Sequence, residues 1–277
     1  MNTSPASTGL GLLSAASWGG SDFAGGWGAR KAPAILITAA GQIASFAILL
    51  AVSLALHAGM PGRHDLILTV IGGFEGALCL ALFYRALAIG SMGLTAALTG
   101  LLTALVPVAF SALHYGLPGP ITAAGLVAGC VAIWLITHQH GATPPRALLY
   151  GSLAGIGFGV QLVLFKLAAS SSFLSMMTVV RAAGLTALVL VLALVRPSAR
   201  GSSFWVAGII SGMLDTAGNI FYLAASRIGR LDTAAVVCSL YPAVTFLLAM
   251  IFLRERPSRR QLTGMVFALA AVALLSL

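Results

Sequence analysis

Charged residues are the scarcest feature of this chain. Of its 277 residues, only 8% are Asp, Glu, Lys or Arg, whereas 59% are hydrophobic. A soluble domain carries about 25% charged residues and about 45–50% apolar ones. A soluble fold of this length has too little interior to hide so much apolar surface. The composition therefore excludes an ordinary soluble protein and indicates a chain that lies partly in lipid.

Cysteine is rare as well. The three cysteines, Cys79, Cys130 and Cys238, are isolated within apolar blocks. An odd number with no close spacing excludes a disulfide framework and a zinc site of the usual pattern. His138 and His140 are too few for a metal site and are expected among lipid headgroups. We therefore expect no metal.

Motifs of nucleotide and peptide hydrolysis are missing. The chain has no GxxxxGK[ST] phosphate loop and no His-Glu-x-x-His helix. Its Gly-x-Gly-x-Gly run at 155–159 lies inside an apolar block, where it is interpreted as a packing stripe. We expect no cofactor, and we expect that the chain is not an enzyme.

Acidic residues are few, with 6 Asp and Glu against 15 Lys and Arg. In a soluble protein such a balance suggests nucleic acid. Here the basic residues fall mostly between apolar blocks, as at 30–31 and 254–260, where they would face lipid headgroups. Nucleic acid is therefore not expected as a partner, and the bilayer is.

The apolar residues form blocks of about 20, the length at which an α-helix crosses a hydrocarbon core. The short alternating segments of a membrane barrel are absent. No basic segment precedes the first block, which is therefore interpreted as a mature span and not a cleaved signal. Gly, Pro, Arg and His clusters separate ten predicted spans near 8–28, 33–57, 65–89, 91–114, 119–138, 146–168, 173–195, 203–225, 231–253 and 258–277.

An internal repeat divides the chain into two halves. A shift of 139 residues, without a gap, superposes several residues of the first half on identical residues of the second. Two of these pairs carry the most weight: Pro118 with Pro257 and, seven residues later, Gly125 with Gly264. Both pairs lie at the turn into the fifth span of a half.

Each half holds five spans, an odd number, so the second half must insert upside down relative to the first. Inverted repeats of this kind are typical of secondary transporters. We therefore predict an all-α membrane protein of ten transmembrane helices, arranged as two inverted five-helix repeats (1–138 and 146–277) around a central cavity.

The end of the chain carries the clearest family pattern. Leu240-Tyr-Pro-Ala-Val-Thr leads to Phe252-Leu-Arg-Glu-Arg-Pro-Ser, followed by Gln261-Leu-Thr-Gly. This stretch resembles the EamA domains of the drug/metabolite transporter superfamily, with Pro in the ninth span, Glu255 at its exit and Gln-x-x-Gly opening the tenth. The first half departs from the pattern, since Pro107 lies four residues later than Pro242 in repeat register and Gly116 replaces the Glu.

The resemblance covers essentially the whole chain and has definite implications. Within the superfamily the chain is most similar to amino-acid exporters of the YddG type. The resemblance implies a multi-pass protein of the inner (plasma) membrane that moves a small molecule by alternating access. It also implies a central cavity lined by the first, third, fourth, sixth, eighth and ninth helices.

Ionisable groups are costly inside a membrane and usually face a bundle interior or a watery cavity. Asp22, Glu75, Arg181 and Asp215 lie deep within predicted spans, whereas Asp65 is expected in a loop. The repeat places Asp215 opposite Gly76, so Glu75 and Asp215 are expected at similar depths. Each carboxylate either belongs to a substrate or proton site or pairs structurally, with Arg181 or a backbone group.

Other polar and aromatic residues share faces with these groups. Asp215, Asn219 and Tyr222 are four and seven apart, and therefore on one helix face. The threonines of the fourth span, four residues apart, either line the cavity or bond their own helix backbone. The predicted substrate-binding residues are Trp18, Asp22, Glu75, Thr99, Gln161, Asp215, Asn219, Tyr222 and Tyr241.

Together these features predict a secondary transporter that exports amino acids or similar small metabolites. The alternative is a membrane enzyme or a lipid-headgroup-handling protein without solute flux. A second alternative is a scaffold, against which the many polar residues inside spans argue. Basic residues concentrate in the odd-numbered loops, which should face the cytoplasm, so both termini are expected outside, although the resemblance implies the reverse.

Overall fold

The computed structural model describes residues 5–115, 119–137, 143–168, 172–197, 203–228, 237–238 and 240–275. These residues contain ten α-helices and no strand. The helices are α1 (Pro5–Ala29), α2 (Ala34–Ala55), α3 (Arg63–Ile89), α4 (Met92–Tyr115), α5 (Pro120–Thr137), α6 (Pro145–Leu167), α7 (Phe173–Val195), α8 (Ser203–Ile228), α10 (Tyr241–Phe252) and α11 (Arg259–Leu275).

Each predicted span coincides with one of these helices, with ends that differ by a few residues. The exception is the ninth span, because α10 covers only its second half and residues 229–236 and 239 lie outside the described part. Six helices, α2, α3, α4, α6, α7 and α8, are long and apolar enough to cross a membrane. Large hydrophobic side chains such as Leu54, Leu194 and Ile251 are exposed on the outer faces of the bundle, as expected where the solvent is lipid.

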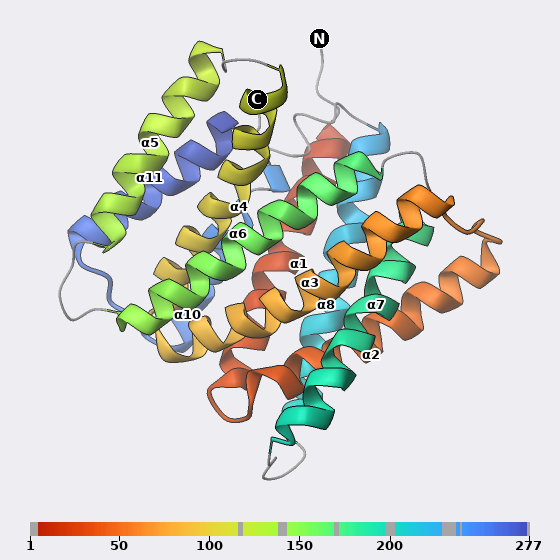
Figure 1. Ribbon diagram of the computed structural model, residues 1–277. Helices are drawn as coiled ribbons and strands as arrows, with labels where there is room; N and C mark the ends of the chain where they lie inside the picture. The colour runs from red at the N-terminus through yellow and green to blue at the C-terminus, as the bar shows by residue number, and fades with distance from the viewer. Residues whose placement is uncertain are drawn as a thin grey trace.

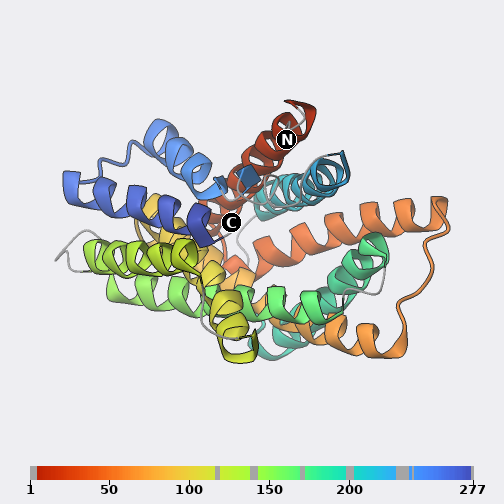
Figure 2. The same ribbon diagram turned by 90° about the horizontal axis from the view of Figure 1, so that it is seen from above.

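The helices form an elongated bundle in which sequence neighbours are often not the closest partners (Figures 1 and 2). Helices α5 and α11, which carry few polar side chains beyond their ends, pack against each other at one end of the bundle, and α2 and α7 lie at the other. Between them, α1 packs mainly on α8, α3 on α6, and α4 on α6. The first turn of α1 and the last turn of α11 lie at the upper side in Figure 1, and the turn between α1 and α2 lies at the lower side.

Serines seven residues apart hold α1 against α8. Ser7, Ser14 and Ser21 donate hydrogen bonds of 2.9, 2.8 and 2.9 Å to backbone carbonyl oxygens of α8. The three acceptors, on Ala225, Gly218 and Ser211, are also seven residues apart but run in the opposite direction. The two helices are therefore antiparallel and in contact over about four turns, with each buried hydroxyl satisfied.

Small residues allow a close approach between α2 and α8. A Cβ atom added at Gly208 or Gly212 would meet backbone atoms of α2, including those of Gly41. Ser45 of α2 donates to the Gly212 carbonyl oxygen at 2.8 Å. The glycine stripe of α8 is thus a packing surface, in agreement with the role of small residues in membrane helices.

The family-like segment at the end of the chain contains a helix cap. Ser258 and Gln261 form a capping box, in which the Gln261 side-chain oxygen accepts from the Ser258 amide at 2.8 Å and the Gln261 amide donates to the Ser258 hydroxyl at 3.2 Å. A capping box satisfies two amides that have no partner within the helix. The Gln at the start of α11 therefore fixes where that helix begins.

Candidate substrate site

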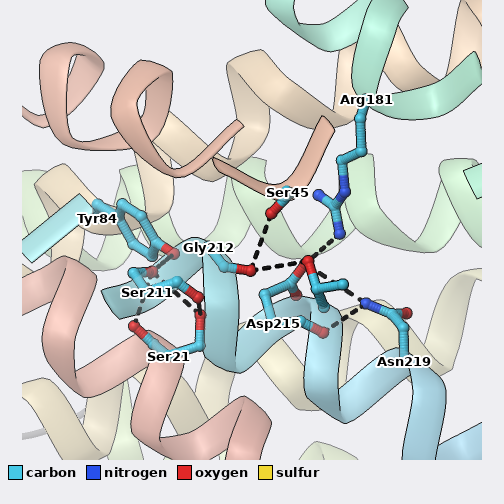
Figure 3. A network of polar contacts seen from close by, with 9 residues as sticks. Ser21, Ser45, Tyr84, Arg181, Ser211, Gly212, Asp215 and Asn219 are labelled. Carbon is cyan, nitrogen blue, oxygen red and sulfur yellow. Dashed lines mark hydrogen bonds and ion pairs between the residues drawn. The ribbon is translucent and has the colours of Figure 1, made fainter. Parts of the chain in front are cut away.

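An ion pair lies inside the bundle where α2, α3, α7 and α8 meet. Arg181 of α7 donates to Asp215 of α8, as Figure 3 shows. The Asn219 amide, one turn further along α8, donates to the Asp215 backbone oxygen at 2.7 Å and lies 3.4 Å from its carboxylate. Both charges lie in helices of membrane length, where ionisable groups occur chiefly at functional sites.

Asp22 of α1 lies beside this pair. Its side chain is buried, and the charges of Asp22 and Asp215 are close enough to interact. One Asp22 carboxylate oxygen, Oδ2, has no hydrogen-bond partner. Arg181 pairs with Asp215, and no ion pair among the described residues joins Asp22 to a cation. The region therefore has two carboxyl groups and one guanidinium, which favours a further positive charge.

Further polar atoms around the pair are also unsatisfied. They are Nε of Arg181 and the side-chain oxygen of Gln42 on α2. A buried polar group without a partner costs about 1–3 kcal/mol, which makes such groups rare unless water or a ligand completes them. The cavity they face has a volume of about 10 Å³, enough for a single water. In this conformation the site is closed to anything as large as an amino acid.

A hydroxyl cluster borders the carboxylates and was not predicted from the sequence. The Tyr84 hydroxyl of α3 lies 2.5 Å from the Ser211 hydroxyl of α8, which donates to the Ser21 carbonyl oxygen at 3.1 Å (Figure 3). Ser21 precedes Asp22 directly, so the cluster fixes α1 at the level of the carboxylates. The seven-residue spacing of Ser7, Ser14 and Ser21 was the signal available in the sequence.

Three aromatic side chains from three helices lie together next to the charged group. Trp18 of α1 has ring-centroid distances of 5.9 Å to Tyr222 of α8 and 6.2 Å to Tyr241 of α10. Trp18 also lies against Gly218, one turn from Asp215. The structure thus brings six of the nine predicted site residues into one region: Trp18, Asp22, Asp215, Asn219, Tyr222 and Tyr241.

Glu75 and Gln161 form a second polar group, between α3 and α6. Glu75 accepts a hydrogen bond from the Cys79 thiol at 3.0 Å, and its other oxygen is buried without a partner. The Gln161 amide donates to the Gly72 carbonyl oxygen at 2.6 Å. These two predicted residues are therefore not part of the Asp215 group.

Thr99 lies in the packing between α4 and α6. Its hydroxyl is buried and donates to the Gly151 carbonyl oxygen at 3.0 Å. One turn on, the Thr103 hydroxyl lies 2.9 Å from the Thr99 carbonyl oxygen and 3.2 Å from that of Gly155. No described hydrogen bond joins Thr99 to another predicted residue.

Asp65 is not in a loop, contrary to the prediction. The helix α3 begins at Arg63, which places Asp65 in its first turn, where its side chain is buried and lies 3.2 Å from the His64 ring. A carboxylate in the first turn complements the helix dipole. The difference arises because the helix begins before its apolar block does.

Glu255 was noted only as part of the family pattern, and its contacts join three segments. The chain turns sharply after α10, with Arg254 in the left-handed region (φ 52°) and the Glu255 amide donating back to the Ala249 carbonyl oxygen at 3.3 Å. A left-handed residue directly after the last helical turn is a common way for a helix to end. The turn directs the Glu255 side chain toward the N-terminus of α4.

There the Glu255 carboxylate accepts from the Ser91 hydroxyl at 3.0 Å and from the amides of Met92 and Gly93 at 2.8 and 3.4 Å. It also lies 3.4 Å from the Arg30 guanidinium, at the turn between α1 and α2. An anion at a helix N-terminus is favoured by the unpaired amides and the dipole. Glu255 therefore ties the exit of α10 to α4 and to the end of α1.

Replacement of Glu255 by Ala should release the first turn of α4. A hydrogen bond to a charged group contributes about 1.5–3 kcal/mol, so we expect the amides of Met92 and Gly93 to exchange with deuterium about tenfold faster or more. Hydrogen-exchange mass spectrometry over peptides covering 89–95 measures this. Arg256→Ala, an exposed neighbour on the same loop, serves as the control, and equal protection in both variants would contradict the assigned contact.

The described residues contain no group of three or more His, Cys, Asp and Glu side chains that could hold a metal ion. The chemistry available in the region of Asp215 is therefore ionic and aromatic: two carboxylates, one guanidinium and three rings. Such a set suits a small molecule that carries both charge and an apolar part.

Comparisons with known proteins agree with a membrane protein. Residues 145–277 match the model of the EamA-like transporter family. No curated protein matches the chain. Among the solved structures, one crystal structure of a protein matches with a TM-score of 0.67 at 20% identity, covering 97% of this chain and 95% of that one. At this identity the likeness concerns the fold alone. The chain is thus a multi-pass membrane protein whose residues 145–277 match an EamA-like transporter domain.

Proposed function

We propose that the chain is a secondary transporter of the drug/metabolite superfamily that exports amino acids or similar small metabolites across the plasma membrane by alternating access. The EamA-like match of residues 145–277 supports a transporter. The substrate class rests on the chemistry of the region around Asp215.

The observation that carries the proposal is the incomplete charge group of Asp22, Arg181 and Asp215. Asp22 Oδ2 and Arg181 Nε are buried without partners. The first is a hydrogen-bond acceptor and the second is a donor. An amino acid would supply an ammonium group to the first and a carboxylate to the second. Its side chain would then lie against the rings of Trp18, Tyr222 and Tyr241.

The contacts between helices support two inverted repeats. The 139-residue shift converts the contact of Gly41 with Gly212, between α2 and α8, into the contact of Val180 with Gly73, between α7 and α3, which the structure also contains. Likewise, the approach of Asp22 to Asp215 corresponds to the contact of Gln161 with Gly76.

The helix pairs follow the same rule. The packing of α1 on α8 corresponds to that of α6 on α3, and the packing of α1 on α10 corresponds to that of α6 on α4. If a two-fold axis relates the halves, each contact between them must occur twice, with the roles of the two halves interchanged. The contacts related by the 139-residue shift occur in this way. We therefore infer repeats 1–138 and 146–277, each with five spans, related by an axis in the membrane plane.

This arrangement gives the site its mechanism. The interface of α1 with α8 joins the two halves, so rocking of one half against the other would open the carboxylates first to one side and then to the other. The small cavity at Arg181 and Asp215 corresponds to a closed intermediate. The contacts of Glu255 with α4 and Arg30 would then have to break when the cavity opens toward the side of the basic, odd-numbered loops.

A counterflow screen tests the proposal. Purified protein in proteoliposomes is loaded with each unlabelled amino acid in turn, and uptake of the labelled form is measured. We expect exchange of a subset with apolar or aromatic side chains. Thr186→Val, on the outer face of α7, should transport normally, whereas Asp22→Asn should reduce exchange at least tenfold because it removes the group assigned to the ammonium. Absence of exchange for every amino acid with correctly folded protein would exclude this substrate class.

A further inference from the structure

An open cleft of about 680 Å³ lies outside the candidate site, between the ends of α1, α2, α3 and α7. Its lining combines three cationic side chains, Arg30, Lys31 and Arg85, with apolar ones. The apolar wall is formed by Ile35, Leu78, Ala81, Leu82 and Val191. The cleft therefore has one charged part and one part suited to hydrocarbon.

The three cations are incompletely neutralised. Arg30 lies 3.4 Å from Glu255, whose carboxylate is shared with the amides at the start of α4. Lys31 lies 4.6 Å from the centre of the Trp27 ring, a contact that leaves its charge uncompensated. Arg85 is exposed, and no ion pair joins it to any described acidic residue. The cleft thus has an excess of positive charge.

The position of the cleft fits the charge pattern of the whole chain. The turn between α1 and α2 is at the lower side in Figure 1, where α7 also ends. Both positions lead into odd-numbered loops, and the odd-numbered loops and their borders together carry Arg30, Lys31, Arg146, Arg196, Arg200, Arg254, Arg256, Arg259 and Arg260. Basic loops are expected at the cytoplasmic side, and basic pockets between membrane helices on the cytoplasmic side are suited to anionic lipid headgroups.

The start of α2 adds to the same field. Pro33 precedes this helix without a side-chain cap, and the first residues of the helix line the cleft. The positive end of the helix dipole therefore lies at the cleft, together with the cations. Its contribution is secondary to that of the three side chains.

We propose that the cleft binds one anionic phospholipid. The phosphate lies between Lys31 and Arg85, with Arg30 nearby, and an acyl chain follows the wall formed by Leu78, Leu82 and Val191. A zwitterionic lipid would bring its own cation to a site that already has an excess of positive charge. The inference concerns a surface separate from the Asp215 group, and it holds whether or not the chain transports amino acids.

Two measurements on the full-length protein in detergent test this site. The first is the thermal midpoint with added phosphatidylglycerol, phosphatidylcholine or inorganic phosphate. The second is native mass spectrometry, which counts retained lipids without relying on stability. The test variant is Lys31→Gln/Arg85→Gln, and the control is Arg256→Gln/Arg259→Gln, which removes two exposed charges from the same side but outside the cleft.

We expect phosphatidylglycerol alone to raise the midpoint of the wild type and to remain bound as one molecule. The apparent affinity should fall about tenfold or more in the test variant, because two cations at the phosphate are lost, and by less than about twofold in the control. Arg85→Lys should keep binding, which guards against a folding defect in the double variant.

Other outcomes overturn the proposal. Equal losses in the test and control variants would mean general attraction to a basic surface. A midpoint raised equally by inorganic phosphate would identify a site for a soluble anion. Equal retention of phosphatidylcholine would mean that the cleft holds hydrocarbon only.

Discussion

We expect replacement of Arg181 by Gln to lower the free energy of unfolding and to abolish transport. The guanidinium is the ion-pair partner of Asp215, and without it a carboxylate remains inside the bundle with only the Asn219 amide, 3.4 Å away, as a side-chain partner. Removal of one member of a buried pair costs about 3–5 kcal/mol. We expect a loss of about that size in the free energy of unfolding, measured by thermal or chemical denaturation in detergent.

The double variant Arg181→Gln/Asp215→Asn separates stability from function. With both members of the pair replaced, neither leaves the other as an unpaired charge, and such replacements are often neutral. We therefore expect most of the stability to return while exchange stays below about one tenth of the wild-type rate, because a charged site in a membrane helix is retained chiefly for function. Gln is a suitable replacement, since the repeat places Gln42 at the position equivalent to Arg181.

Thr186→Val on the same helix is the control for expression and reconstitution. Its hydroxyl is exposed and bonds only the Ala182 carbonyl oxygen of its own helix, at 2.9 Å. If the double variant recovered exchange together with stability, the pair would be structural only. The substrate site would then have to lie elsewhere, and the proposal made from Asp22 and Arg181 would fail.

The helices were predictable because the membrane leaves the chain few choices. Blocks of about 20 apolar residues can satisfy their backbone only as helices, and the breaks at Gly, Pro and Arg separate them well. The start of α3 was misplaced because His64 and Asp65 are polar yet helical. An amphipathic first turn at a headgroup region has no hydropathy signal.

The composition of the site was less predictable, because a polar residue inside a membrane has two possible roles. Thr99 and Gln161 were expected at the substrate, but each donates to a backbone oxygen across a helix interface. Asp22 and Asp215 cannot be satisfied in that way, since carboxylates accept and backbone oxygens also accept. Hydroxyl and amide side chains that can donate to a backbone oxygen are therefore weak indicators of a substrate site.

Some contacts depend on which helices are neighbours in space, and the sequence contains little information about them. Trp18, Tyr222 and Tyr241 come from helices far apart in the chain, and only the resemblance to a family placed these helices around one cavity. Glu255 is similar, because its partners at Ser91 and Met92 lie in the other half of the chain. A short sequence motif can identify such a residue, but it does not show which residues that residue contacts.

The glycines at the interfaces between the halves provide the second large expected effect. A Cβ at Gly212 would meet backbone atoms of Gly41, and a Cβ at Gly73 would meet backbone atoms of Val180. Backbone cannot move aside as a flexible side chain does, so Gly212→Ala and Gly73→Ala must each separate two helices. Overpacking typically costs about 1–3 kcal/mol, and we expect the upper end of this range, about 3 kcal/mol, for each variant.

Gly9→Ala is the matched control, because no atom lies within 4 Å of a Cβ at that exposed position of α1. Ala is about 1 kcal/mol better than Gly in a helix, so this variant should be as stable as the wild type or slightly more stable. Whether Gly→Ala raises or lowers the free energy of unfolding then depends on what the added Cβ meets, and not on the change of residue type. Denaturation of the three variants side by side measures it.

Equal losses at Gly73 and Gly212 would also support the two-fold relation of the halves. The repeat makes the two glycines equivalent, and each lies against the helix that the repeat assigns as its partner. If Gly212→Ala were strongly destabilised while Gly73→Ala behaved like the control, the α3–α7 and α2–α8 interfaces would not be equivalent. The packing would then lack the symmetry from which alternating access has been inferred, and the transport proposal would rest on the Asp22, Arg181 and Asp215 group alone.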